Sequence, residues 1–166
     1  MADIDKERLS QLKMFCRASY AASSFLEALS HLEEMLKYNR KEDGQVWQAF
    51  WIAAVVSYCR PFTRNDGLGK ESTNLIPERF KGLHERIYEE HRNDTLAHTD
   101  PNKKEMNSLV FTVTKTPNHT DIWHDPTRYH PKTAEVEEFL EMVREIYRSS
   151  GELVKERMLH LPETAL

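Results

Sequence analysis

One long stretch of the chain contains neither glycine nor proline, and it constrains the fold more than any other feature. This stretch runs from about Asp5 to Tyr38. Its apolar residues recur at the three- and four-residue spacing of a helix face: Leu9, Leu12, Phe15, Ala22, Leu26, Leu29, Leu32 and Leu36. Such a helix would extend roughly 50 Å at 1.5 Å per residue. Because this is long for a chain of 166 residues, we expect a bend or break near 21–24.

Two further helices are expected before the middle of the chain. The segment 46–60 is apolar on nearly every face, which is typical of a central helix, and Pro61 ends it. Pro77 begins a third helix that extends to about His98. The inner face of this third helix carries Phe80, Leu83, Ile87 and His91.

The last third of the chain contains a predicted β-hairpin followed by a predicted helix. Alternating, β-branched sequence at 109–114, a turn, and the segment 120–123 indicate a small hairpin. Thr133 can cap a final helix whose first turns are acidic. We therefore predict an all-α fold, an antiparallel bundle of four to five helices with a β-hairpin insertion near 108–124. Residues 1–166 are expected to form a single domain.

Composition limits the class of function. Lysine and arginine number 23 against 27 aspartate and glutamate residues, for a formal charge of −4. A protein that coats nucleic acid needs a strongly basic face, so this class is disfavoured, whereas recognition at a small cleft stays open. Cys16 and Cys59 form no CxxC pair, and the longest apolar run, 49–56, is too short to cross a bilayer. We expect a cytoplasmic protein without membrane association.

Residues whose side chains can take part in catalysis or ligand binding are concentrated in the segment 91–100. It contains two histidines, one arginine and two aspartates within ten residues, where a helix used only for packing would show leucine and alanine. His84, His91 and His98 are seven residues apart, so on an α-helix they share a face. In the plainest interpretation, these histidines cap the helix end and pair with Asp94. A second interpretation is a metal site formed by His91, Asp94 and His98, although no Cys or HExxH pattern supports it.

A third interpretation comes from a family resemblance. The string from Arg92 to His98, Arg-Asn-Asp-Thr-Leu-Ala-His, resembles the Arg-polar-x(3 to 5)-His motif of the HEPN superfamily. The extension to Asp100 is similar to strings in bacterial HEPN-like proteins. The helical layout agrees over about residues 5–158. The five-residue spacing between arginine and histidine is allowed, although four is commoner, and the hairpin is a departure that would have to be an insertion.

The resemblance implies a function and roles for individual residues. Active family members are metal-independent endoribonucleases that work as dimers, of toxin or phage-defence type. By this resemblance His98 would be the general acid or base at the ribose 2′-hydroxyl or the leaving oxygen, and Arg92 would hold the scissile phosphate. Asn93, Asp94 and His91 would support them. No cofactor or metal is implied; the expected partners are a second copy, RNA or a nucleotide, and an antitoxin.

Helix geometry adds an independent constraint on this motif. In a straight α-helix, six positions separate Arg92 and His98 by about 9 Å along the axis and about 120° around it. The two side chains of one such helix then cannot both contact the same phosphate group. Either the helix ends before His98, or two subunits contribute to one site.

The alternative function is a non-catalytic dimeric helical module that binds a nucleotide or a protein partner.

Overall fold

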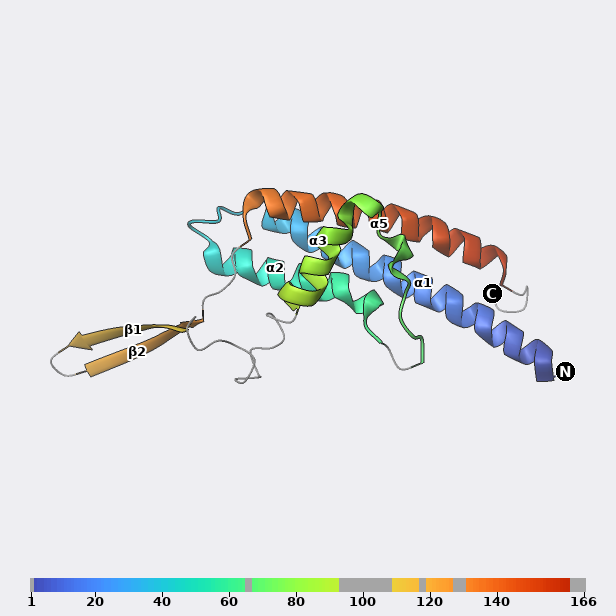
Figure 1. The fold of residues 1–166 in the computed structure, drawn as a ribbon, viewed down its shortest axis with the longest axis horizontal. Helices are drawn as coiled ribbons and strands as arrows, with labels where there is room; N and C mark the ends of the chain where they lie inside the picture. Colours follow the sequence, from blue (N-terminus) through green and yellow to red (C-terminus); the bar gives the residue numbers. More distant parts are fainter. Residues whose placement is uncertain (1, 65–66, 93–108, 117–118, 127–130, 162–166) are drawn as a thin grey trace.

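The chain is predominantly helical, as predicted (Figure 1). The computed structural model describes residues 2–64, 67–92, 109–116, 119–126 and 131–161. The helices α1 (Ala2–Met35), α2 (Gly44–Cys59) and α5 (Thr133–Leu159) lie lengthwise, and α2 and α5 both run opposite to α1 (Figure 1). The shorter α3 (Lys81–Glu85) crosses them (Figure 1).

The expected break in the first helix is wrong, because α1 continues without interruption for 34 residues. Its buried apolar positions alternate in steps of three and four residues: Ala18, Ala21, Phe25, Ala28, Leu32 and Met35. This spacing keeps one stripe facing the core along the helix. Three members are alanine, which favours the helical conformation and lets neighbouring helices approach closely. The small residues near position 21 thus serve packing instead of ending the helix.

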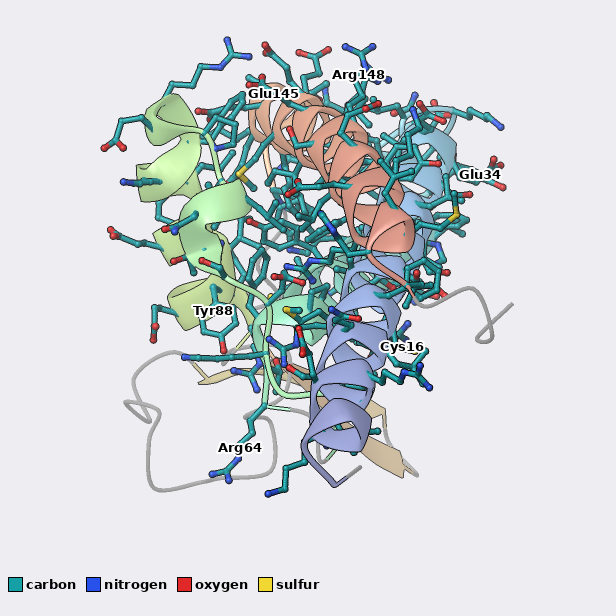
Figure 2. All side chains as sticks on the ribbon, turned by 90° about the vertical axis from the view of Figure 1, so that its right-hand side faces the viewer. Cys16, Glu34, Arg64, Tyr88, Glu145 and Arg148 are labelled. Atoms are coloured by element: carbon teal, nitrogen blue, oxygen red, sulfur yellow. The ribbon has the colours of Figure 1, made fainter. Side chains whose placement is uncertain are left out.

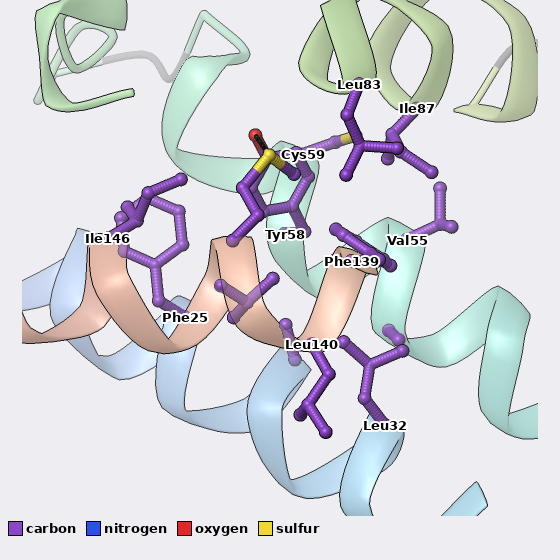
Figure 3. Close-up of a cluster of buried hydrophobic side chains, with 14 of the residues drawn as sticks. Phe25, Leu32, Val55, Tyr58, Cys59, Leu83, Ile87, Phe139, Leu140 and Ile146 are labelled. Atoms are coloured by element: carbon purple, nitrogen blue, oxygen red, sulfur yellow. Dashed lines mark hydrogen bonds between the residues drawn. The ribbon is translucent and has the colours of Figure 1, made fainter. Parts of the chain in front are cut away.

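The core lies where α1 packs against α2 on one side and α5 on the other. Figure 3 shows side chains from these three helices and from the third-helix region meeting in one cluster. Its largest fully buried members are Trp47, Tyr58, Phe25, Phe139, Leu32, Met35, Ile87 and Met142. Trp47 and Trp51 are both 2% exposed and belong to this core.

The second helix has one outer face that the described residues leave uncovered. Val46 and Ile52 are 38% and 36% exposed, and Ala49 is exposed beside them. Ala53 and Val56 continue this face and are half-buried. The helix expected to be central is thus enclosed on its Trp47 side, and its opposite side is an exposed apolar surface.

A loop after α2 is fixed between the ends of α1 and α5. Glu71 is 4% exposed, and its carboxylate lies 3.3 Å from Nη1 of Arg157 on α5. The same guanidinium donates to the backbone oxygen of Met14 on α1, at 2.7 Å. Arg17 donates through Nε to the backbone oxygen of Leu68, at 2.6 Å. One buried carboxylate and two arginines thus hold this loop against both long helices.

Two strands lie between the third helix and α5. The strands β1 (Leu109–Thr116) and β2 (His119–Pro126) pair antiparallel, with Leu109 opposite Pro126 and Thr116 opposite His119. In Figure 1 this pair projects away from the helices.

Substitution of Arg157 tests the attachment of the loop. In an Arg157→Ala protein, the buried Glu71 carboxylate loses its charged partner and keeps only the backbone N–H of Ser72, so the free energy of unfolding should fall by about 3 kcal/mol. Urea denaturation followed by circular dichroism measures this change. The control is Arg144→Ala, because Arg144 and its partner Glu33 are 43% and 50% exposed. That change should cost less than about 1 kcal/mol, and equal losses in the two variants would contradict the buried-pair interpretation.

Candidate functional site

The third helix is built from three kinds of helical turn. A 3₁₀ turn, η3 (Glu78–Phe80), follows Pro77 and leads into α3, and a π-helical segment, η4 (Arg86–His91), follows α3. The predicted inner face is confirmed, because the following residues are all buried: Phe80, Leu83, Ile87 and His91. A π-helical segment is uncommon and often lies at a functional site.

His84 is a buried histidine with a fixed partner. Its Nδ1 lies 2.7 Å from the Tyr58 hydroxyl, which joins α3 to α2 by a hydrogen bond. The ring of Tyr88 stacks on the imidazole, with centroids 5.5 Å apart. Burial lowers the pKa of His84, and the charges of Glu85 and Glu89 oppose this shift only in part. His84 therefore acts as a structural residue in its neutral form.

His91, predicted as a supporting residue and as a metal ligand, lies in the core. It is 6% exposed, and its ring meets the edge of Trp51 on α2, with centroids 5.5 Å apart. Its Nε2 lies 3.5 Å from Oε1 of Glu135 on α5. His91 thus links the third helix to α2 and α5. Within the described part of the chain, no group of three or more His, Cys, Asp or Glu side chains is placed to hold a metal ion.

Arg92 comes directly after η4 and differs from His91 in its surroundings. Its guanidinium carbon lies 5.1 Å from the ring centroid of Tyr88, within the range of a cation–π contact. Its side chain is half-buried, so the charge stays within reach of solvent. The two adjacent residues therefore differ in burial: the side chain of His91 lies in the core, and that of Arg92 reaches the surface.

The thiol of Cys59 lies within the electrostatic influence of Arg92. Burial raises the pKa of Cys59 to about 12, and the positive charge of Arg92 opposes this rise without overcoming it. Cys59 is 2% exposed. At neutral pH this thiol is protonated and enclosed, so Cys59 packs as a small hydrophobic residue and is not a nucleophile.

Two other arginines, Arg60 and Arg64, follow the end of α2. Arg60 pairs with the carboxylate of Glu27 on α1, and the Ser57 hydroxyl donates to the same carboxylate. The Arg60 side chain is thus used in an ion pair between α1 and the end of α2. Arg64 is exposed and extends from the edge of the molecule that also carries Tyr88 (Figure 2).

The remaining predicted site residues lie outside the described residues. They are Asn93, Asp94 and His98. Arg92 and His91 are thus the members of the predicted site whose positions the structure gives: His91 is buried in the core and Arg92 is half-buried against Tyr88.

A cleft between the α1–α2 turn and the start of α5 was not anticipated from the sequence. It has a volume of about 840 Å³ and is lined by Leu36, Tyr38, Asn39, Arg40, Lys41, Gly44, Trp47 and Thr133. It shares no lining residue with the surroundings of Arg92. Arg40 and Lys41, two adjacent basic residues in the turn between α1 and α2, were the sequence signal that could have indicated this cleft. The sequence does not show, however, that α5 begins beside this turn.

Comparison with protein-family models, with curated proteins and with solved structures gives no match. Among the described residues, no helix has the length and apolar character needed to cross a membrane.

The pH dependence of stability tests the state assigned to His84. Its folded pKa lies below its ordinary value, so the unfolded chain binds the proton more readily as the pH falls below about 6.5. The free energy of unfolding should therefore decrease from pH 7 to pH 5. In a His84→Gln protein this decrease should be smaller, as measured by urea denaturation at each pH. Identical pH dependence in the two proteins would show that His84 is not buried in its neutral form.

Proposed function

We propose that this protein is a HEPN-like, metal-independent endoribonuclease in which Arg92 binds the scissile phosphate and His98 transfers the proton. The observation that supports this most directly is the position of Arg92. It lies at the surface after a π-helical segment, while the two preceding histidines of the same helix face inward. The structural role of His91 also disfavours the competing proposal of a metal site at His91, Asp94 and His98.

The proposed chemistry needs only the two side chains. The guanidinium of arginine presents a planar set of N–H donors that matches phosphate oxygens and stabilises charge that develops on them. Histidine titrates near neutral pH and can take the proton from a ribose 2′-hydroxyl or supply one to the leaving oxygen. In this proposal Asn93 and Asp94 orient these groups. Tyr88 holds the Arg92 guanidinium over its ring, which reduces the number of orientations open to it.

The family arrangement extends the proposal to the whole chain. We propose a four- to five-helix antiparallel bundle in which the strands β1 and β2 form an insertion between the third helix and α5. The expected partners are RNA and, in a toxin-like setting, an antitoxin. The formal charge of −4 opposes the approach of RNA over the whole molecule, but Arg92 supplies positive charge at the proposed site.

The active unit is proposed to be a dimer. The separation of Arg92 and His98 along a helix favours a site completed by a second subunit. The outer face of α2 supports this, because Val46, Ala49 and Ile52 form an apolar surface that the described residues leave exposed. Such a surface gains stability when a second copy covers it.

Cleavage of RNA in the presence of EDTA tests the catalytic proposal. The wild-type protein should cleave, and both Arg92→Ala and His98→Ala should reduce the rate by about a hundredfold or more, because each removes a group that acts in the transition state. Arg148→Ala is the matched control. Arg148 is an exposed arginine on α5, away from Tyr88 in Figure 2, and its loss should leave cleavage unchanged.

The outcome also separates the two classes of function. Circular dichroism must show that all four proteins are folded. If folded wild-type protein cleaves no RNA, the catalytic proposal is rejected in favour of a non-catalytic dimeric module that binds a nucleotide or protein partner. If chelation alone removes the activity, a metal-dependent enzyme replaces the proposal.

The dimer is tested by a charge on the outer face of α2. Ile52→Asp should convert the dimer to a monomer in sedimentation velocity, because an exposed aspartate is tolerated in the monomer but costly inside an apolar interface. Leu159→Asp is the control, since Leu159 is 81% exposed near the end of α5. A wild-type monomer, or a dimer that persists in the Ile52 variant, would contradict this interface.

A further inference from the structure

One side of α1 faces away from the core and carries a stripe of uncharged residues. They follow one another in steps of three and four, so they lie along a single line on the helix surface. Three leucines of this stripe, at positions 9, 12 and 26, are 53%, 40% and 47% exposed. Figure 2 shows the Cys16 side chain on the outer edge of α1, away from Tyr88. The outer stripe of α1, as we call it, consists of Leu9, Leu12, Cys16, Ser19, Ser23, Leu26 and Ser30.

The exposed surface of α5 shows what a helix in contact with water carries in this protein. Its exposed residues between 137 and 156 are Glu137, Glu138, Glu141, Arg148, Ser149, Glu152, Lys155 and Glu156. All of them except the serine are charged. The exposed residues of α1 between 9 and 30 are Leu9, Ser10, Leu12, Lys13, Met14, Ser23, Leu26, Glu27 and Ser30. Only the lysine and the glutamate are charged. An uncharged, partly apolar stripe of this length is typical of a surface that another protein covers.

The outer stripe has the same pattern of side chains in both directions. Leu12 and Leu26 lie seven residues before and seven residues after Ser19. The positions between them, Cys16, Ser19 and Ser23, carry small side chains, which let the axes of two packed helices approach closely. A surface with this symmetry can pack against a copy of itself that is rotated by a half turn, with a leucine at each end of the contact.

Charge favours a second copy in the antiparallel direction. From 6 to 17, all the charged residues of α1 except Glu7 are basic, and from 18 to 35 all of them are acidic. Lys13 and Glu27 directly follow two leucines of the outer stripe and are fourteen residues apart, so they lie on the same side of it. In an antiparallel pair of α1 helices, Lys13 of each copy meets Glu27 of the other. A parallel pair would instead place the two basic ends together.

The ion pair that Glu27 makes within its own chain leaves room for this second contact. Its carboxylate pairs with Arg60, yet the Glu27 side chain is 51% exposed. The two oxygens of a carboxylate can accept hydrogen bonds from more than one donor. Lys13 is exposed as well. Both charges can therefore reach a second copy while the fold of each chain stays as it is.

We propose that the outer stripe of α1 is a self-association surface, on which α1 of a second copy packs in the antiparallel direction. Because one helix from each copy supplies the contact, the buried area is small, and association is reversible and depends on protein concentration. The outer stripe shares no residue with the outer face of α2 or with the surroundings of Arg92. The proposal therefore rests neither on the ribonuclease activity nor on the dimer proposed for it. Where both contacts form, they join dimers into larger assemblies.

Sedimentation velocity of an Ile52→Asp protein tests this contact by itself, because that change removes the contact proposed for α2. At low micromolar concentration the protein should be a monomer, and it should associate reversibly to a dimer as the concentration rises. Leu26→Asp in the same background should raise the dissociation constant by about a hundredfold, because it encloses a carboxylate in the contact. Leu159→Asp makes the same change at a position that is 81% exposed near the end of α5, and it should leave association unchanged.

A charge exchange tests the antiparallel direction. In the same background, Lys13→Glu should weaken association by about tenfold, because like charges then meet at both ends of the contact. Glu27→Lys should weaken it for the same reason. A mixture of these two proteins should associate as strongly as the parent protein, since opposite charges then meet at both ends. Lys155→Glu, on an exposed part of α5, is the matched control and should have no effect.

Several outcomes would overturn the proposal. A monomer at every concentration would exclude the contact, whether or not the protein cleaves RNA. Association that both Leu26→Asp and Leu12→Asp leave unchanged would place the contact elsewhere on the chain. Association that Lys13→Glu does not weaken, or that the mixture does not restore, would reject the antiparallel direction. Circular dichroism verifies that each variant is folded, and Leu12→Asp replaces Leu26→Asp if the latter is not.

Discussion

The interaction on which the arrangement of this protein depends is the buried hydrogen bond between Tyr58 and His84. The ring of Tyr58 contacts Phe25 on α1 and Phe139 on α5, so the residue lies where all three long helices meet. Its hydroxyl is enclosed by these apolar groups and requires a polar partner. His84 is that partner, at 2.7 Å. Because the hydrogen bond is short and directional, it fixes where the third helix crosses the core.

The position of Arg92 follows from this constraint. Seven residues after His84, His91 makes a second inward contact, with Trp51 and Glu135. Two anchored histidines leave little freedom to the turn between them, which is π-helical. The next residue, Arg92, then has to leave the core, and Tyr88 provides the ring over which its charge rests. The position of Arg92 is thus set by contacts that His84, His91 and Tyr88 make within the protein.

The sequence predicted the features that depend on local pattern. Helical content and the inner face of the third helix follow from residue spacing, and both are confirmed. The continuity of α1 was missed, because small residues near Ala21 can either weaken a helix or permit close packing, and only the neighbouring helices decide between these. The role of His91 was missed for a similar reason: Glu135 is distant in sequence, and its approach depends on the tertiary fold. The cleft at Trp47 requires two helix starts that lie far apart in the chain.

The cleft between the α1–α2 turn and α5 lies where two helices begin, and this position has a physical cause. Along the middle of α1, α2 and α5 the inward side chains are committed to the core, and the backbone N–H and C=O groups are paired within each helix. Backbone donors without a helical partner, and polar side chains that are not needed for core packing, are therefore concentrated where helices begin or end. A net charge of −4 does not prevent anion recognition at such places, since basic residues and helix dipoles act over a few ångströms, where the distant acidic groups are screened by salt. For a helical chain of this size, the ends of helices are thus the places where chemistry can be added without loss of the core.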